Sequence, residues 1–361
     1  MEKIKKSIIP IIKIISFICL FILLFTYISY MSKPMKIDLQ NIAGLYGEKE
    51  NSIDVVYIGG SACFVYYEPL KAWEDYGIVV YDYGANTIMP EIYKNMIIEV
   101  LKTQKPKLII LDSRAFQYRE DENISHNHPS EVAYRNTLTG MKFSLNKINF
   151  IKNNIKKYIE DDKLSYYFDL IKYHKTISYN KQNLEMMQGK YKMPYRGFHF
   201  VKKHLSLKKQ NFKTDERENL PEETNKIFDE LLEYIKQTNT DYLFVVSPYI
   251  EEIEHKKIFN TIEEKVNEYG YKFLDANEYT DAMSLDYNTD FYNNGHINIF
   301  GADKYTDFLS KYIIENYEIP NRKEDKEYEY MNENLEEWHK EVENTKNAIY
   351  KIIEESKNDG K

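Results

Sequence analysis

The sequence predicts an α/β protein built on a parallel sheet, with one transmembrane helix before the folded domain. Two observations predict this class. An uncharged apolar run near the N-terminus is about long enough to cross a bilayer, and strand-like and helix-like segments then alternate along the chain. With 361 residues, the chain has room for one sizeable α/β domain with insertions, or for two small ones.

The apolar run extends from Ile14 to Ser32 and contains no charged residue. It is preceded by Lys3, Lys5, Lys6 and Lys13. Because lysines are enriched on the inner side of a membrane, residues 1–13 are expected in the cytoplasm and the folded domain outside the cell. A cleaved signal peptide is the alternative, but no small-residue cleavage site follows the run. We therefore predict an uncleaved, single-pass anchor in the cell membrane.

Composition argues against several classes of protein. The formal net charge of −8 does not favour nucleic-acid binding, which depends on neutralising phosphates. The two cysteines are Cys19, inside the apolar run, and Cys63, so no disulfide within the outer domain is possible. No zinc-binding pattern is present, and we expect neither a metal nor a cofactor.

Residues 33–50 are expected to form a tether, and residues 51–320 the α/β domain. Buried strands are predicted at Ile53–Ile58, Ile78–Tyr83, Leu108–Leu111, Tyr242–Val246 and Tyr271–Leu274. Helices are predicted over Pro90–Thr103, from about Pro221, over Glu251–Tyr269 and from about Gly301.

The segment from about residue 117 to 217 separates the third and fourth strands. A structureless loop of this length would be unusual in a compact domain, so we predict a helical insertion that caps or flanks a site and determines specificity. His174 lies in a helical context within it, and we interpret this residue as packed or on the surface.

Residues 321–361 are expected to form a charged helical tail. Apolar or small residues recur in it at steps of three and four, namely Tyr328, Met331, Leu335, Trp338, Val342, Thr345, Ile349 and Ile352. This heptad-like stripe predicts a helix docked on its own domain, and pairing with another chain is the alternative.

The first candidate for chemistry is Ser61, which follows a buried strand and Gly59-Gly60 at the start of an expected helix. In open α/β sheets, ligands bind beyond the carboxyl ends of the strands. A serine there exposes its hydroxyl to the crevice, and backbone N–H groups at a helix start can stabilise an oxyanion. A serine in this position also caps ordinary helices, so the motif by itself does not establish catalysis.

The second candidate is His296, in the block Asp290-Phe-Tyr-Asn293-Asn-Gly-His296-Ile-Asn. A nucleophilic serine needs a base, and histidine, which titrates near neutrality, is the usual one. That base is oriented by a carboxylate or an amide, and both Asp290 and Asn293 precede it on the same loop.

Taken together, these blocks resemble the SGNH/GDSL hydrolase superfamily. The similarity covers about residues 53–317 and rests on Gly59-Gly60-Ser61, Glu-Asp-Tyr-Gly-Ile at 74–78, Lys-Pro-Lys-Leu-Ile-Ile-Leu-Asp at 105–112 and the 290–298 block. It is greatest with the membrane-anchored bacterial branch that includes DltD-like teichoic-acid D-alanylation proteins and exopolysaccharide O-acetylation proteins. The resemblance implies a flavodoxin-like three-layer α/β/α fold, with Ser61 as nucleophile and His296 as base.

The chain departs from the family pattern at one position. The family usually has an aspartate three residues before the catalytic histidine, where this chain has Asn293. An amide can orient an imidazole but stabilises the imidazolium less than a carboxylate does, and Asp290 is the alternative acid. The family's oxyanion glycine and asparagine are loosely matched by Gly84 and Asn86, although an Asn in a turn also has a structural explanation.

Two residues near the expected strand ends have alternative roles. Arg114 follows the third strand and could bind a phosphate or carboxylate of a polymer, or form a local ion pair with Asp112. Cys63 lies two residues after Ser61, and we interpret it as a buried small hydrophobe.

The sequence thus predicts an extracytoplasmic serine acyl-ester hydrolase or O-acyltransferase that acts on a cell-envelope glycopolymer such as a polysaccharide or teichoic acid. The resemblance implies a membrane-bound O-acyltransferase as partner. The alternative is a weak or inactive accessory protein that binds that enzyme or the polymer, and self-association through the C-terminal helix is a further possibility.

Overall fold

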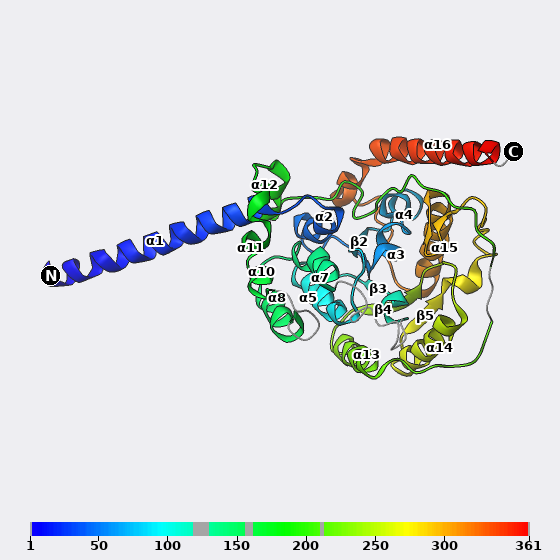
Figure 1. Ribbon diagram of the computed structural model, residues 1–361, viewed down its shortest axis with the longest axis horizontal. Coiled ribbons are helices and arrows are strands. Elements are labelled where there is room, and N and C mark those ends of the chain that lie inside the picture. Colours follow the sequence, from blue (N-terminus) through cyan, green and yellow to red (C-terminus); the bar gives the residue numbers. More distant parts are fainter. Residues whose placement is uncertain (1, 118–129, 156–161, 210–212, 360–361) are drawn as a thin grey trace.

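The computed structural model describes residues 2–117, 130–155, 162–209 and 213–359 (Figure 1). Its centre is a five-stranded parallel sheet with the order β2-β1-β3-β4-β5. The strands are β1 (Val55–Gly59), β2 (Val80–Gly84), β3 (Leu108–Asp112), β4 (Asp241–Val246) and β5 (Lys272–Asp275). The boundaries of each strand lie within two residues of a predicted segment, so the α/β class and the parallel sheet are confirmed.

Helices cover both faces of this sheet. Side chains alternate between the two faces along each strand, so each face packs its own set of side chains against its own helices. Ile58 and its equivalents pack against α5 (Tyr93–Thr103), α13 (Glu222–Ile235) and α14 (Ile253–Glu268). Tyr57 and its equivalents pack against α3 (Ser61–Phe64) and α15 (Ile299–Asn316). With both faces covered, β1, β2 and β3 are buried along their whole length, which explains their nearly continuous apolar sequences.

Strand β1 lies between β2 and β3, so the chain builds the sheet first to one side of β1 and then to the other. Such a reversal leaves a crevice at the carboxyl ends of the two central strands, where open α/β sheets bind their ligands. In this protein the crevice lies where β1 leads to Ser61 and β3 ends at Asp112.

Helix α1 (Glu2–Ser32) extends away from the domain (Figure 1). Its stretch from Ile8 to Ser32 is long and apolar enough to cross a membrane, and it includes the predicted run from Ile14. The C-terminal end of α1 is docked on the domain, where Met31 and Ser32 are buried near α11 (Asp169–Tyr173) and α12 (Lys181–Gln188).

The predicted tether is folded instead. Residues 37–44 form helix α2 (Ile37–Gly44), which is followed by a 3-10 turn, Leu45–Gly47. Leu39 and Ile42 face the core, and the Asp38 carboxylate accepts hydrogen bonds from the Asn86 backbone and side chain at 2.6 and 2.9 Å. The expectation of a tether was wrong here because the apolar residues of this short segment, three apart, form a buried helical face.

The insertion has a helical and an extended part. Its described helices are α7 (Ser130–Leu138), α8 (Leu145–Phe150) with a π-helical turn (Ile151–Ile155), α10 (Leu164–Tyr167), α11 with a 3-10 turn (His174–Thr176), and α12. Residues 118–129, 156–161 and 210–212 of the predicted insertion lie outside the described residues. Helices α11 and α12 contact α1, whereas the extended part passes the crevice, with hydrogen bonds from His199 N to Phe64 O and from Leu205 N to Phe291 O.

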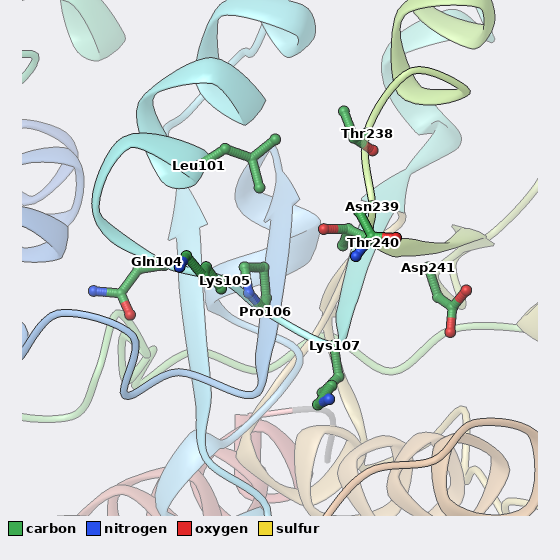
Figure 2. Close-up of a pocket in the computed structure, with 9 residues that line it drawn as sticks. All are labelled: Leu101, Gln104, Lys105, Pro106, Lys107, Thr238, Asn239, Thr240 and Asp241. Carbon is green, nitrogen blue, oxygen red and sulfur yellow. The ribbon is translucent and has the colours of Figure 1, made fainter.

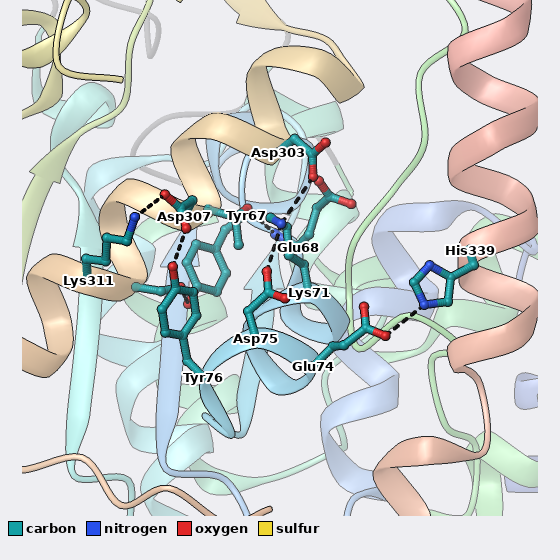
Figure 3. Close-up of polar contacts among 12 residues, drawn as sticks. Tyr67, Glu68, Lys71, Glu74, Asp75, Tyr76, Asp303, Asp307, Lys311 and His339 are labelled. Carbon is teal, nitrogen blue, oxygen red and sulfur yellow. Dashed lines mark hydrogen bonds and ion pairs between the residues drawn. The ribbon is translucent and has the colours of Figure 1, made fainter. Parts of the chain in front are cut away.

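The C-terminal tail docks on its own domain through a 3-10 segment (Lys326–Asn332) and α16 (Leu335–Asp359). Trp338, Thr345 and Ile349 of the predicted stripe are buried. Polar contacts join α4 (Pro69–Tyr76), α15 and α16, including a 2.9 Å contact between Glu74 and His339 (Figure 3). The stripe therefore faces this domain, as the docked-helix interpretation predicted; residues 360–361 lie outside the described chain.

Candidate active site

Ser61 lies at the carboxyl end of β1, at the first position of the short helix α3. The strand ends are close together here, and a Cβ added to Gly59 would lie 2.7 Å from the Asp112 Cβ. At Gly84 an added Cβ would lie 2.8 Å from Gly59 O. These two glycines let β2 and β3 approach β1, so the Ser61 side chain emerges from a tightly packed sheet edge.

His296 reaches Ser61 from a small antiparallel hairpin formed by β6 (Phe291–Asn293) and β7 (His296–Ile297). Its Nε2 lies 2.6 Å from Ser61 Oγ, and its Nδ1 lies 2.9 Å from Asn293 Oδ1. The Gly295 N–H also donates to Asn293 Oδ1, at 2.8 Å, which identifies this atom as an acceptor. The ring proton then belongs on Nδ1, and Nε2 is free to accept the serine proton.

Asp290, the alternative acid, has other partners. Its carboxylate accepts hydrogen bonds from Lys304 Nζ and the Asp286 N–H, each at 2.7 Å, and from Thr289 Oγ1 at 2.8 Å. The side chain is 1% exposed. The contact to the imidazole is therefore made by Asn293, and Asp290 holds the preceding turn against α15.

Arg114 contacts the histidine loop. Its Nη1 donates to Gly295 O at 2.9 Å and to Tyr66 Oη at 3.2 Å, and its guanidinium stacks on the Tyr249 ring with 4.2 Å to the centroid. The hydrogen bond to Asp112, at 3.1 Å, comes from the Arg114 backbone N–H. The guanidinium thus positions the loop that carries His296, and binding of a substrate anion by Arg114 stays a prediction.

The electrostatic surroundings keep His296 neutral. Burial, and secondarily the positive charge of Arg114, lower the pKa of His296 to about 3. Burial also raises the pKa of Asp112 to about 6, against the influence of Arg114. An uncharged imidazole can accept a proton at neutral pH, but the same surroundings disfavour the imidazolium that results.

The two predicted oxyanion residues differ in their surroundings. Gly84 lies in the sheet beside Gly59, where the absence of a Cβ permits close packing, and its role at an oxyanion stays a prediction. One N–H of the Asn86 side-chain amide donates to Asp38, which fixes the direction of the amide and leaves its second N–H as a donor. In the described part of the chain, the N–H groups of Ser61 and Ala62 have no acceptor, and they are the alternative donors for an oxyanion.

Several residues of the site were missed by the sequence analysis. The Tyr292 ring stacks on His296 with 5.1 Å between centroids, and Tyr66 donates to Gly295 O at 2.7 Å. Ser247 lies 3.4 Å from Arg114 Nη1. Ser247 directly follows β4, so its position at a strand end could have indicated it; Tyr66 and Tyr292 have no such signal.

Two residues that were interpreted as structural lie away from the reacting atoms. Cys63 is fully buried, and burial raises the pKa of its thiol well above the usual value, as for a packed hydrophobe. His174 is exposed on the insertion, where its Nδ1 lies 3.0 Å from Ile171 O.

A hollow of about 790 Å³ lies at the opposite edge of the sheet, lined among others by Pro106, Lys107 and Asp241 (Figure 2). These residues lie at the amino ends of β3 and β4, whereas ligands of open parallel sheets bind at the carboxyl ends. We therefore place the candidate site at Ser61. No group of three or more His, Cys, Asp or Glu side chains in the described ranges could hold a metal ion.

The chain was compared with known proteins. No protein-family model, no curated protein and no solved structure matches it.

Proposed function

We propose that this protein is a membrane-anchored serine hydrolase or O-acyltransferase of the SGNH type that acts on acyl esters of a cell-envelope glycopolymer. The observation that carries the proposal is the hydrogen-bonded series Ser61, His296 and Asn293 at the carboxyl end of β1. The strand order 2-1-3-4-5 is that of flavodoxin-like sheets, which supports the three-layer fold implied by the resemblance.

The geometry supports a two-step acyl transfer. Ser61 Oγ attacks the carbonyl carbon of the acyl ester while His296 Nε2 takes the serine proton, and the proton then passes to the departing alcohol. An acyl-serine results. A hydroxyl of the glycopolymer, or water, next attacks the acyl carbon; His296 takes its proton and returns it to Ser61 Oγ. The acyl group is thereby transferred to the polymer or released as an acid.

The N-terminal helix supports a location at the membrane. The lysines before the apolar stretch favour a cytoplasmic N-terminus, with the α/β domain outside the cell. A membrane-bound O-acyltransferase that delivers the acyl group from inside is the partner that this arrangement favours.

The first test is labelling of the full-length chain, in detergent, with a fluorophosphonate probe that reacts with activated serines. We expect labelling of the wild type, none of Ser61→Ala, and strong loss in His296→Ala. Ser356→Ala on α16 is the matched control and should label normally, since Ser356 Oγ donates to Ile352 O within the helix. Undiminished labelling of Ser61→Ala would contradict the proposal.

A second candidate function is an accessory role, in which the domain binds the acyltransferase or the polymer without catalysing the reaction. Two observations at His296 favour this role. Its orienting partner is the neutral amide of Asn293, and its pKa is lowered to about 3, and each of these makes the imidazole a weaker base. The two candidates differ in cells that lack the native protein. The accessory role predicts that Ser61→Ala restores polymer acylation fully, and the catalytic role predicts that it does not.

A further inference from the structure

A groove of about 540 Å³ lies between α1 and the helical part of the insertion. On the α1 side it is lined by Phe21, Ile22 and Phe25, and on the insertion side by Met141, Phe143, Phe168 and Ile171, among others. The rings of Phe25 and Phe168 meet edge to face, with 5.6 Å between centroids. The insertion therefore contacts α1 along the apolar stretch itself.

The length of the groove corresponds to one leaflet of a bilayer. Phe21 lies twelve residues before Lys33, at the other end of the lining. At 1.5 Å per helical residue, the groove follows α1 for about 18 Å. Half of a hydrocarbon core of ~30 Å is about 15 Å, so an acyl chain of one leaflet matches the length of the groove.

The edge of the insertion around this groove exposes large apolar side chains. We call this edge the collar and define it by Phe143, Leu145, Leu164, Phe168, Ile171 and Ile177, which are 39 to 78% exposed. Helices α8, α10 and α11 lie on the side of the domain that α1 enters (Figure 1). A concentration of exposed apolar side chains marks an interaction surface, and the collar lies beside a helix that itself requires an apolar environment.

The end of the groove toward the domain is cationic. Lys147 and Lys33 are 2% and 6% exposed, and both face one carboxylate, that of Asp169, at 3.9 and 3.1 Å. Lys33 also donates to Thr139 O at 2.6 Å, whereas Lys147 has only the distant Asp169 as an ionic partner in the described part of the chain. Burying a charge is costly unless a partner compensates it, so an anion bound in the groove would stabilise Lys147 beyond its 3.9 Å contact with Asp169.

The sequence around the collar is basic. Between Lys142 and Lys175 the described residues include six lysines and two aspartates, although the formal net charge of the protein is −8. Lysines at a membrane surface favour anionic lipid headgroups.

We propose that the groove binds one anionic phospholipid, whose acyl chain lies along Phe25 and Phe168 and whose phosphate faces Lys147 and Lys33. The collar then rests in the leaflet on the domain side of the membrane. This inference depends on the membrane anchoring proposed above and is independent of the acyl-ester chemistry.

The test uses the full-length chain with Cys19→Ala, which leaves Cys63, a fully buried thiol. Single cysteines at Phe143 in the groove, Leu23 on α1 and Tyr350 on α16 are labelled with an environment-sensitive fluorophore, and each protein is reconstituted in phosphatidylcholine vesicles. Brominated phosphatidylglycerol or brominated phosphatidylcholine is added at equal fraction as a quencher. Tyr350 is the matched control, an exposed apolar side chain on the docked tail.

We expect quenching at positions 143 and 23 but not at 350. At position 143, brominated phosphatidylglycerol should quench about fivefold more effectively than brominated phosphatidylcholine, the factor for one lysine–phosphate contact at a bilayer surface. The preference should disappear in Lys147→Gln and increase in Asp169→Asn, which removes the competing carboxylate. Lys172→Gln, on the same insertion, should leave it unchanged.

The outcomes separate the parts of the inference. Equal quenching by both lipids at position 143 overturns the anionic-lipid site. Quenching at 23 without quenching at 143 overturns the lipid contact but keeps the anchor, and shows that another segment or partner fills the groove. No quenching at either position overturns the anchor and this inference together, whereas the acyl-ester proposal is tested separately by the labelling of Ser61.

Discussion

The segment from Asp286 to His296 has two parts that use polar side chains differently. In the first part, the Asp290 carboxylate is buried and accepts three hydrogen bonds, one of them from the ammonium of Lys304. In the second part, the Asn293 amide oxygen accepts hydrogen bonds from Gly295 N and His296 Nδ1, and the charge near the ring is that of the cationic Arg114.

This difference separates folding from chemistry. The negative charge of Asp290 is neutralised by Lys304, so it stabilises the turn and does not stabilise an imidazolium. The amide of Asn293 fixes the tautomer and direction of the imidazole but adds no charge. The loop therefore provides a well-oriented base that becomes protonated only with difficulty, and substitutions in the two parts should affect different measurements.

The largest expected effect is loss of the base. His296→Ala should lower kcat for hydrolysis of an activated acyl ester by about 10³-fold, the middle of the range for general acid–base catalysis. The matched control is His174→Ala on the insertion, which should retain wild-type kcat because its Nδ1 contacts only Ile171 O in the described part of the chain. Equal losses in both variants would indicate a folding defect, and no loss in His296→Ala would remove the base from the mechanism.

The next effect is on stability. Asp290→Asn should lower the free energy of unfolding by about 2 to 3 kcal/mol, because hydrogen bonds to a charged group are replaced and Lys304 keeps only its hydrogen bond to Ser284 O after losing the ion pair with Asp290. Chemical denaturation monitored by circular dichroism measures this change. The kcat of the folded variant should stay within a few-fold of wild type, whereas a loss comparable to that of His296→Ala would show that Asp290 is the acid that serves His296.

Much of this architecture could be predicted from the sequence. Strands β1, β3 and β4 are short, mostly apolar runs that are buried over most of their length, and such runs are visible without a structure, whereas β5 begins with an exposed lysine. The Ser61 and His296 motifs each follow a glycine at the end of a strand or turn, and the structure places the two side chains 2.6 Å apart.

Other features depend on long-range contacts that no local pattern encodes. The helix α2 is amphipathic over only two turns, so its burial depends on the partners that β2 and α7 provide. Asp290 and Asn293 both precede His296, and only their hydrogen-bond partners distinguish their roles. The guanidinium of Arg114 contacts Gly295 and Tyr249, which lie far away in the sequence, so no local pattern around Arg114 could indicate these contacts.

The smallest expected effect concerns the charge of the residue that orients the base. Asn293→Asp should raise kcat about tenfold, because a charge-assisted hydrogen bond stabilises the imidazolium about twice as strongly as a neutral one. It should also raise the pKa of His296 from its lowered value of about 3.

The pH dependence of activity should change accordingly. Activity is lost on acidification when the base becomes protonated, so wild-type kcat/KM should stay level from about pH 8 to about pH 5, and the variant should lose activity at a higher pH than wild type. A pH–rate profile with parallel NMR titration of the imidazole measures both changes. Asn294→Asp, which adds the same charge one residue later on the same turn, is the control. If Asn293→Asp raised the pKa of His296 without raising kcat, proton transfer to His296 would not limit the reaction.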